Sequence, residues 1–135
     1  MTRLRVLFDT NVLISAVLFG GVPGEIVDAA RDGAIDGVVS LHILGELREV
    51  LTRERFGVDE VIADALVEEI AESFEVTMVE RASAGWSADP DDDPVVEAAL
   101  LSGVSHVVTG DRHLLALVVR DVLFVTPGEM LALLR

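Results

Sequence analysis

The expected fold follows from one stretch of the chain, residues 3–13, which reads Arg3-Leu4-Arg5-Val6-Leu7-Phe8-Asp9-Thr10-Asn11-Val12-Leu13. Residues 4–8 form an apolar run with the length of a buried strand, and the run ends abruptly at Asp9. An apolar helical pattern follows over residues 12–18. In an α/β sheet, ligands bind at the carboxyl ends of the strands, because loops and helix N-termini converge there. Asp9 is therefore expected either to belong to a binding site or to cap the following helix.

Strands and helices alternate along the rest of the chain. Further strands are predicted at residues 37–39, 75–79, 106–109 and 122–125. Helices are predicted at residues 12–18, 24–31, 41–51, 59–74, 94–101, 114–118 and 127–134, with breaks at 19–24 and 81–90. The helix at 59–74 is expected to bury Val61, Ile62, Leu66 and Ile70.

This alternation predicts an α/β fold: a three-layer α/β/α sandwich with a mainly parallel central sheet, in a single domain over residues 1–135. The strands at 4–8 and 106–109 are expected at the centre of the sheet, because their runs are apolar on both faces.

The composition excludes several kinds of chemistry. The chain has a formal net charge of −14, contains no cysteine, and carries ten basic residues, all of them arginine. Disulfides, thiolate metal sites and any reaction that requires a lysine are therefore excluded. An acidic chain is repelled by nucleic acid unless a divalent cation or an arginine patch reverses the field, which disfavours a plain binding module but not a metal-dependent nuclease. No apolar run approaches membrane-spanning length, and a cytoplasmic protein without membrane attachment is expected.

Acidic residues follow several of the predicted strands, at what would be one rim of the sheet. They are Asp9, Glu46, the cluster Asp91-Asp92-Asp93, and Asp111. Taken singly, each has an ordinary explanation as a helix cap, a turn residue or a surface charge. Together they would repel one another unless a cation compensates their charge. Mg²⁺ and Mn²⁺ prefer such oxygen ligands and act on phosphate esters, so the set points to metal-assisted phosphodiester chemistry.

Within the acidic cluster, Asp92 is the favoured metal ligand and Asp93 is the alternative. Pro94 suits the first position of a helix, which makes Asp93 the expected N-cap and leaves Asp92 free to face the metal. The three histidines, His42, His106 and His113, show no metal-ligand spacing, and His106 is expected to be buried in its strand.

Four segments together resemble the motifs of the PIN-domain nucleases, and they span almost the whole chain. These segments are Phe8-Asp9-Thr10-Asn11-Val12-Leu13, the stretch from Ser40 to Leu47, Asp89-Pro90-Asp91-Asp92 with the helix after it, and Val107-Val108-Thr109-Gly110-Asp111-Arg112-His113. The resemblance implies an α/β/α fold and an Mg²⁺- or Mn²⁺-dependent ribonuclease acting on RNA. Many small members are toxins of toxin–antitoxin pairs, the VapC-like group, so a homodimer and an antitoxin protein as partner are expected.

Carried over by motif, the resemblance assigns the catalytic metal site to Asp9, Glu46, Asp92 and Asp111. It gives Asn11 and Thr109 supporting roles, in which their hydrogen bonds orient ligands or water. Among the arginines closest in sequence to these acids, Arg112 is expected to bind substrate phosphate, because it directly follows Asp111. Arg48, Arg53 and Arg55 are further candidates, although Arg53 and Arg55 could instead pair with Glu49 and Glu54.

Two alternatives from other classes remain. A non-catalytic PIN-fold module that binds a partner would keep the fold without the chemistry. A haloacid-dehalogenase-like phosphatase also begins with a strand and an acid, but it needs a second Asp where Asn11 stands and a lysine that this chain lacks. A response-regulator receiver fails on the same missing lysine.

Overall fold

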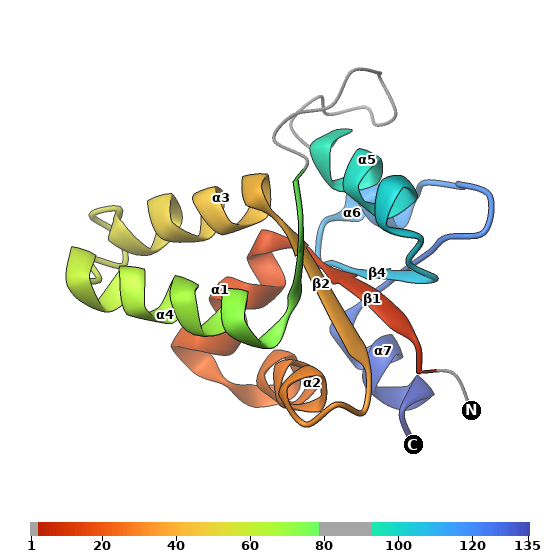
Figure 1. The fold of residues 1–135 in the computed structure, drawn as a ribbon, viewed down its shortest axis with the longest axis horizontal. Helices are drawn as coiled ribbons and strands as arrows, with labels where there is room; N and C mark the ends of the chain where they lie inside the picture. The colour runs from red at the N-terminus through yellow and green to blue at the C-terminus, as the bar shows by residue number, and fades with distance from the viewer. Residues whose placement is uncertain (1–2, 79–92) are drawn as a thin grey trace.

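The chain folds as an α/β/α sandwich in the computed structural model, which describes residues 3–78 and 93–135 and, for Asp93, only the backbone (Figure 1). The strands are β1 (Arg5–Phe8), β2 (Asp36–Ser40), β3 (Glu75–Thr77), β4 (His106–Val108) and β5 (Leu123–Val125). The helices are α1 (Thr10–Phe19), α2 (Gly21–Arg31), α3 (Leu41–Thr52), α4 (Glu60–Ser73), α5 (Asp93–Ser102), α6 (Arg112–Leu115) and α7 (Pro127–Leu133). The predicted loop at 81–90 and the end of the predicted strand at Val79 lie outside the described residues.

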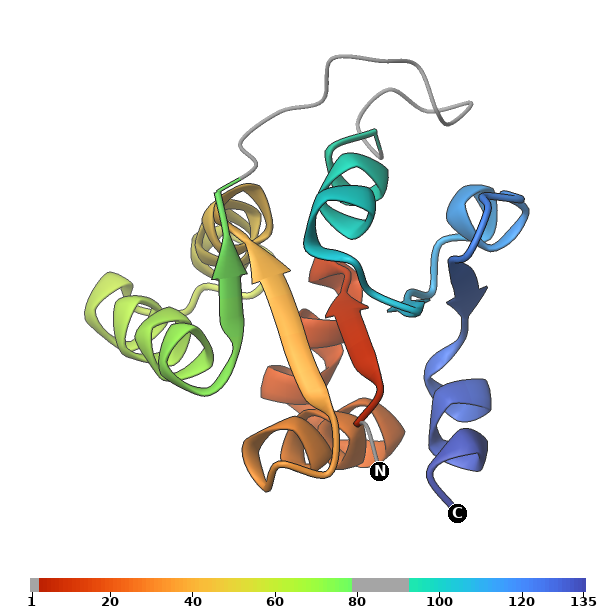
Figure 2. The ribbon, with the colours of Figure 1, turned by 45° about the vertical axis from the view of Figure 1, so that its right-hand side comes forward.

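The sheet is entirely parallel, with the order β3-β2-β1-β4-β5, and Figure 2 shows the strands side by side in this sequence. Right-handed crossovers place α1 to α4 on one face of the sheet and α5 and α6 on the other, and α7 packs against α2. The predicted fold class is therefore confirmed. Because all the strands point the same way, their carboxyl ends form one rim, where acids that follow different strands can meet.

The predicted central strands both lie inside the sheet, and β1 is its middle strand. Val6, Leu7 and Phe8 on β1 are completely buried, as are Val107 and Val108 on β4. The second neighbour of β1 is β2, whose short apolar run did not distinguish it as central. His106 is buried as expected, and its Nδ1 lies 2.7 Å from the Ser105 hydroxyl; burial lowers the pKa of its imidazole.

The predicted break at residues 19–24 is wrong, because only Gly20 separates the first two helices. Gly20 has a φ of 70°, a backbone conformation that ends α1 at Phe19 and that glycine adopts without strain. Pro23 lies in the first turn of α2, where its missing N–H removes no helical hydrogen bond. The sequence Gly-Gly-Val-Pro-Gly reads as a loop, but it contains a helix start.

The predicted buried face of α4 is confirmed for Leu66 and Ile70, which pack inward, but it is wrong for Val61 and Ile62. Val61 and Ile62 are 77% and 56% exposed, whereas Ala63 and Ile70 are buried. The stripe that packs inward runs through Ala63, Leu66, Val67 and Ile70, which share a helical face. Ala63 is completely buried and α4 packs on α3, so the buried stripe is rotated away from the more apolar residues at the helix start.

A glycine on β2 shows how tightly this part of the core is packed. A Cβ added to Gly37 would lie 2.6 Å from two ring atoms of Phe74 and 2.9 Å from the Ala30 Cβ. The Phe74 ring in turn meets Phe8 edge to face, with 5.0 Å between centroids. The strand that carries Asp9 is thereby fixed against α4 and β2.

The last two helices compare differently with their predicted bounds. The helix expected at 114–118 is a single turn at Arg112–Leu115, so it begins directly after Asp111. The terminal helix begins at Pro127 as predicted, and Thr126 and Glu129 form a reciprocal capping box at its start. Within the described residues no single helix is long and apolar enough to cross a membrane; α1 and α2 reach that length only when counted together, and they are bent by 103°.

Candidate active site

Asp9 lies at the carboxyl end of the middle strand, and its carboxylate is almost completely enclosed, with 7% of the residue exposed. Its Oδ1 accepts a hydrogen bond from the Thr10 amide (2.8 Å). Its Oδ2 accepts hydrogen bonds from the Thr109 hydroxyl (2.7 Å) and from Asn11 Nδ2 (3.1 Å). Asp9 therefore caps α1 through Oδ1, which is the ordinary explanation for an acid at this position. Its Oδ2 accepts from two side chains instead, and these contacts are not part of the helix cap.

Burial raises the pKa of the Asp9 carboxyl above its ordinary value, and this is the largest influence on it. The hydrogen bonds from Thr109 and Thr10 act in the opposite direction, because they stabilise the charged form. The negative charges of Glu46 and Asp111 raise the pKa further. Three acids that follow different strands therefore act on one another electrostatically, as expected for a shared rim.

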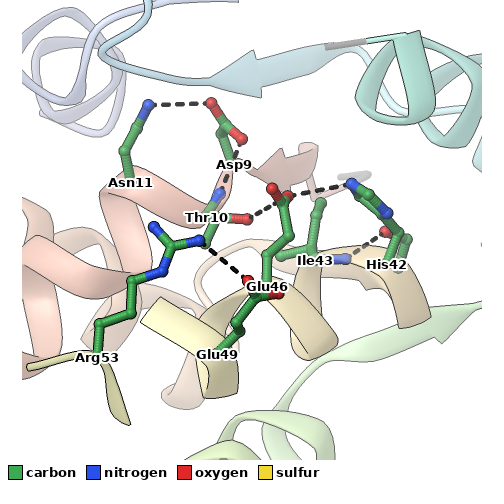
Figure 3. Close-up of polar contacts among 9 residues, drawn as sticks. Asp9, Thr10, Asn11, His42, Ile43, Glu46, Glu49 and Arg53 are labelled. Atoms are coloured by element: carbon green, nitrogen blue, oxygen red, sulfur yellow. Dashed lines mark hydrogen bonds and ion pairs between the residues drawn. The ribbon is translucent and has the colours of Figure 1, made fainter. Parts of the chain in front are cut away.

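Thr10 connects two of these acids directly, as Figure 3 shows. Its amide donates to Asp9, and its hydroxyl donates to Glu46 Oε1 at 3.1 Å. Glu46 lies on the second turn of α3, where His42 Nε2 lies 3.1 Å from the same Oε1, without the alignment of a hydrogen bond. Thr10 and His42 were not predicted as site residues. The spacing of His42 and Glu46, four residues apart on one helix, was the available signal for that contact.

Asp111 and Asn11 connect the end of β4 to the end of β1. Asp111 caps α6, since its Oδ1 accepts from the His113 amide at 2.7 Å, and its own amide donates to the Thr109 hydroxyl at 3.0 Å. Asn11 Oδ1 accepts from the Gly110 amide at 3.2 Å. The completely buried Thr109 hydroxyl thus donates to the Asp9 carboxylate and accepts from the Asp111 amide at the same time.

A cleft of about 470 Å³ opens beside these acids. It is lined by Asp9, Thr10, Asn11, Ile14, Ser15, Phe19, Glu46, Val50, Arg55, Phe56, Val95 and Asp111. Three of the predicted acids and Asn11 therefore face one cavity. Asp92 and the side chain of Asp93 lie outside the described residues.

The predicted arginines are distributed differently from the acids. Arg112 is exposed on the first turn of α6 and is not among the residues that line the cleft. Arg48 pairs with Asp64 on α4, and Arg53 pairs with Glu49 at 3.1 Å, as the helix-surface explanation expected (Figure 3). Arg55 lines the cleft, and its guanidinium carbon lies 5.2 Å from the centre of the Phe56 ring.

The donor chemistry of the rim suits a hard divalent cation, which binds carboxylate oxygens. In the part of the chain that the structure describes, no three acidic or histidine side chains are grouped closely enough to hold one ion. The remaining predicted ligand, Asp92, is outside that part. Burial and the charges of Glu46 and Asp111 disfavour the charged form of Asp9, whereas the hydrogen bonds from Thr109 and Thr10 favour it.

Parallel strands, helices on both faces and acids gathered at one rim define an α/β/α protein with an acidic cleft at the carboxyl ends of its strands. The sequence matches the PIN domain over residues 5–113, and the chain therefore belongs to the PIN-domain family. Membership of this family excludes the alternatives of a haloacid-dehalogenase-like phosphatase and a response-regulator receiver. No curated protein sequence matches the chain.

The fold is that of the VapC toxins. One similar solved structure is VapBC2 from Rickettsia felis, bound to a DNA fragment from their promoter; it has a TM-score of 0.67 and 11% identity over 91% of this chain and 98% of that chain. Another is Mycobacterium tuberculosis VapC20, a Sarcin–Ricin loop-cleaving toxin, with a TM-score of 0.55 and 15% identity over 84% of this chain and 96% of that chain. At these identities the likeness concerns the fold.

Proposed function

We propose that this PIN-domain protein is a metal-dependent endoribonuclease, the toxin of a toxin–antitoxin pair. The observation that carries the proposal is the buried carboxylate of Asp9, whose charged form is disfavoured by burial and by Glu46 and Asp111. A divalent cation would remove this cost, whereas a purely structural cap gains nothing from two further acids beside it.

Mg²⁺ or Mn²⁺ would be held by Asp9, Glu46, Asp111 and Asp92, with Asp93 as the alternative to Asp92. Such an ion lowers the pKa of a bound water and polarises a phosphodiester. The other side chains position these acids. Thr109 and Asn11 fix the orientation of Asp9 Oδ2, and Thr10 holds Glu46 on the side of the cleft where Asp9 lies.

RNA is the proposed substrate, supported by family membership and by the Sarcin–Ricin loop cleavage named for the similar VapC20. An antitoxin protein is the proposed partner, since the similar VapBC2 structure is a toxin–antitoxin assembly. We also propose that the protein forms a homodimer and acts in the cytoplasm.

The competing function is a non-catalytic PIN-fold module. The two are separated by the Asp111→Asn variant, in which the remaining Oδ1 can still accept from the His113 amide, so the fold should persist. Cleavage of a labelled single-stranded RNA in Mg²⁺ is expected to fall by more than about 100-fold. Losing a residue that only orients a metal ligand costs up to about 100-fold, and losing a ligand itself should cost more. Glu46→Gln should behave in the same way.

Glu49→Gln is the matched control, because Glu49 lies three residues further along the same helix and pairs with Arg53 outside the cleft lining. It should keep wild-type cleavage. No cleavage above background by the wild type would favour the non-catalytic module, and equal cleavage in wild type, Glu46→Gln and Asp111→Asn would refute the assigned site.

A further inference from the structure

The cleft extends well beyond the acids. From the rim it follows one face of α1, through Ile14 and Ser15 to Phe19, and the facing side of α3, through Val50 to the turn at Arg55 and Phe56. Phe19 lies nine positions after Thr10 on the helix, which is about 14 Å along the axis at the usual rise per residue. This length exceeds what a single scissile phosphodiester occupies, so the far end of the cleft needs an occupant of its own.

Phe19 is the most unusual residue of this far end, because 77% of it is exposed at the last position of α1. The chain has five phenylalanines, one tryptophan and no tyrosine, so aromatic rings are scarce. Two of the phenylalanines line the cleft: Phe19 is largely exposed, whereas Phe56 is partly buried against the core. Exposed ring faces in a cleft are the platforms on which the unpaired bases of single-stranded nucleic acids stack.

Arg55 is the positively charged residue at the far end of the cleft. Within the described residues, six arginines pair with carboxylates, namely Arg3, Arg5, Arg31, Arg48, Arg53 and Arg120. No such pair is found there for Arg55, which of all the arginines in that part of the chain is the one that lines the cleft. Its guanidinium stands over the Phe56 ring and keeps its charge available for a phosphate.

We infer that Phe19, Phe56 and Arg55 form a subsite for single-stranded RNA, in which a base stacks on the exposed Phe19 ring and Arg55, held over the Phe56 ring, binds a backbone phosphate. The inference rests on the proposed ribonuclease function, because it places the substrate strand next to Asp9 and Glu46. The guanidinium of Arg55, which shares one cleft with the exposed ring of Phe19, suits the alternating phosphates and bases of a nucleotide strand. An apolar peptide would use the same surface without needing either the charge or the aromatic character.

The test measures binding of a short fluorescein-labelled single-stranded RNA of mixed sequence by fluorescence anisotropy. Every variant is made in the Asp111→Asn background, which prevents turnover. Phe19→Leu keeps apolar area but removes the ring face, and it should bind about tenfold more weakly, within the range for losing one stacked base. Phe19→Tyr keeps the ring face and should bind like the parent.

Arg55→Ala should weaken binding and lower the slope of log affinity against log salt by about 0.7, the value for one phosphate contact on a single strand. Arg53→Ala is the matched control, since Arg53 lies two residues earlier and is paired with Glu49. It should leave the slope unchanged.

Full RNA affinity in Phe19→Leu would overturn the subsite and indicate an apolar docking surface for protein instead. An unchanged salt slope in Arg55→Ala, or no RNA binding by the parent, would also overturn it. Cleavage of the same RNA by the wild-type protein in Mg²⁺ is scored separately. If cleavage persists while these variants bind normally, the proposed function stands and only the subsite fails.

Discussion

Replacing Thr109 by valine removes the one hydroxyl that joins two of the proposed metal ligands. Valine has the same shape, so the completely buried site keeps its packing. The substitution deletes the 2.7 Å hydrogen bond to Asp9 Oδ2 and the acceptor for the Asp111 amide at 3.0 Å. Losing a hydrogen bond to a charged group costs about 1.5–3 kcal/mol, and losing a neutral one costs about 1 kcal/mol. The metal-free protein should therefore lose about 3 kcal/mol of unfolding free energy, or roughly 10 °C in Tm for a chain of this size.

The loss should depend on pH, with a sign that follows from Asp9. The Thr109 hydroxyl stabilises the charged carboxylate and so lowers its pKa against the effect of burial; without it the pKa of Asp9 rises further. In the wild type, the folded-state pKa already lies above the unfolded value near 3.9, so charged Asp9 destabilises the fold above that pKa. The Thr109→Val penalty should be complete above the raised pKa that Asp9 has in the folded variant, and it should shrink as the pH falls from there to the pKa of Asp9 in the folded wild type.

Urea denaturation followed by circular dichroism at matched protein concentration, in EDTA, measures both effects. Thr109→Ser is the control, because it keeps the hydroxyl and loses one methyl group, at a cost of about 1 kcal/mol. If valine costs no more than serine, or if the penalty is the same at acid and neutral pH, the hydrogen-bonded Asp9–Thr109–Asp111 arrangement does not have the role assigned to it.

Two further predictions concern packing and assembly. Gly37→Ala should cost about 2 kcal/mol or more of unfolding free energy, since its Cβ would meet the Phe74 ring at 2.6 Å; Gly45→Ala on α3, with no atom within 4 Å of its Cβ, should instead stabilise by about 0.5–1 kcal/mol, and equal effects of the two would refute the packing argument. The wild-type protein should scatter light as a homodimer at tens of micromolar, and a monomer mass there would contradict the proposed assembly.

The parts of the fold that the sequence predicts are those determined locally. The run that ends at Asp9 identifies both a buried strand and its polar end, because strand burial and helix capping each leave a short-range pattern. The same is true of Ser40, a typical N-cap residue, which caps α3 by accepting from the Ile43 amide at 3.0 Å. A parallel sheet then brings the ends of β1 and β4 together, and the Asp9–Thr109 contact follows across 100 residues.

The parts that the sequence does not predict depend on contacts between elements. Val61 and Ile62 are more apolar than Ala63, yet close packing on α3 favours the small residue. Thr10 reaches Glu46 only because α1 and α3 lie side by side. Arg55 follows a helix end, where no periodicity shows which way a side chain points, so the arginine that lines the cleft could not be told from its neighbours.

The central claim is that the acids at this rim hold a divalent cation that is needed for hydrolysis of RNA. The most direct measurement is the cleavage rate of a labelled single-stranded RNA after exhaustive chelation, followed by stepwise return of Mg²⁺ or Mn²⁺. Cleavage should disappear in EDTA and return in a saturable way with either ion. RNA hydrolysis that continues undiminished after chelation would contradict it.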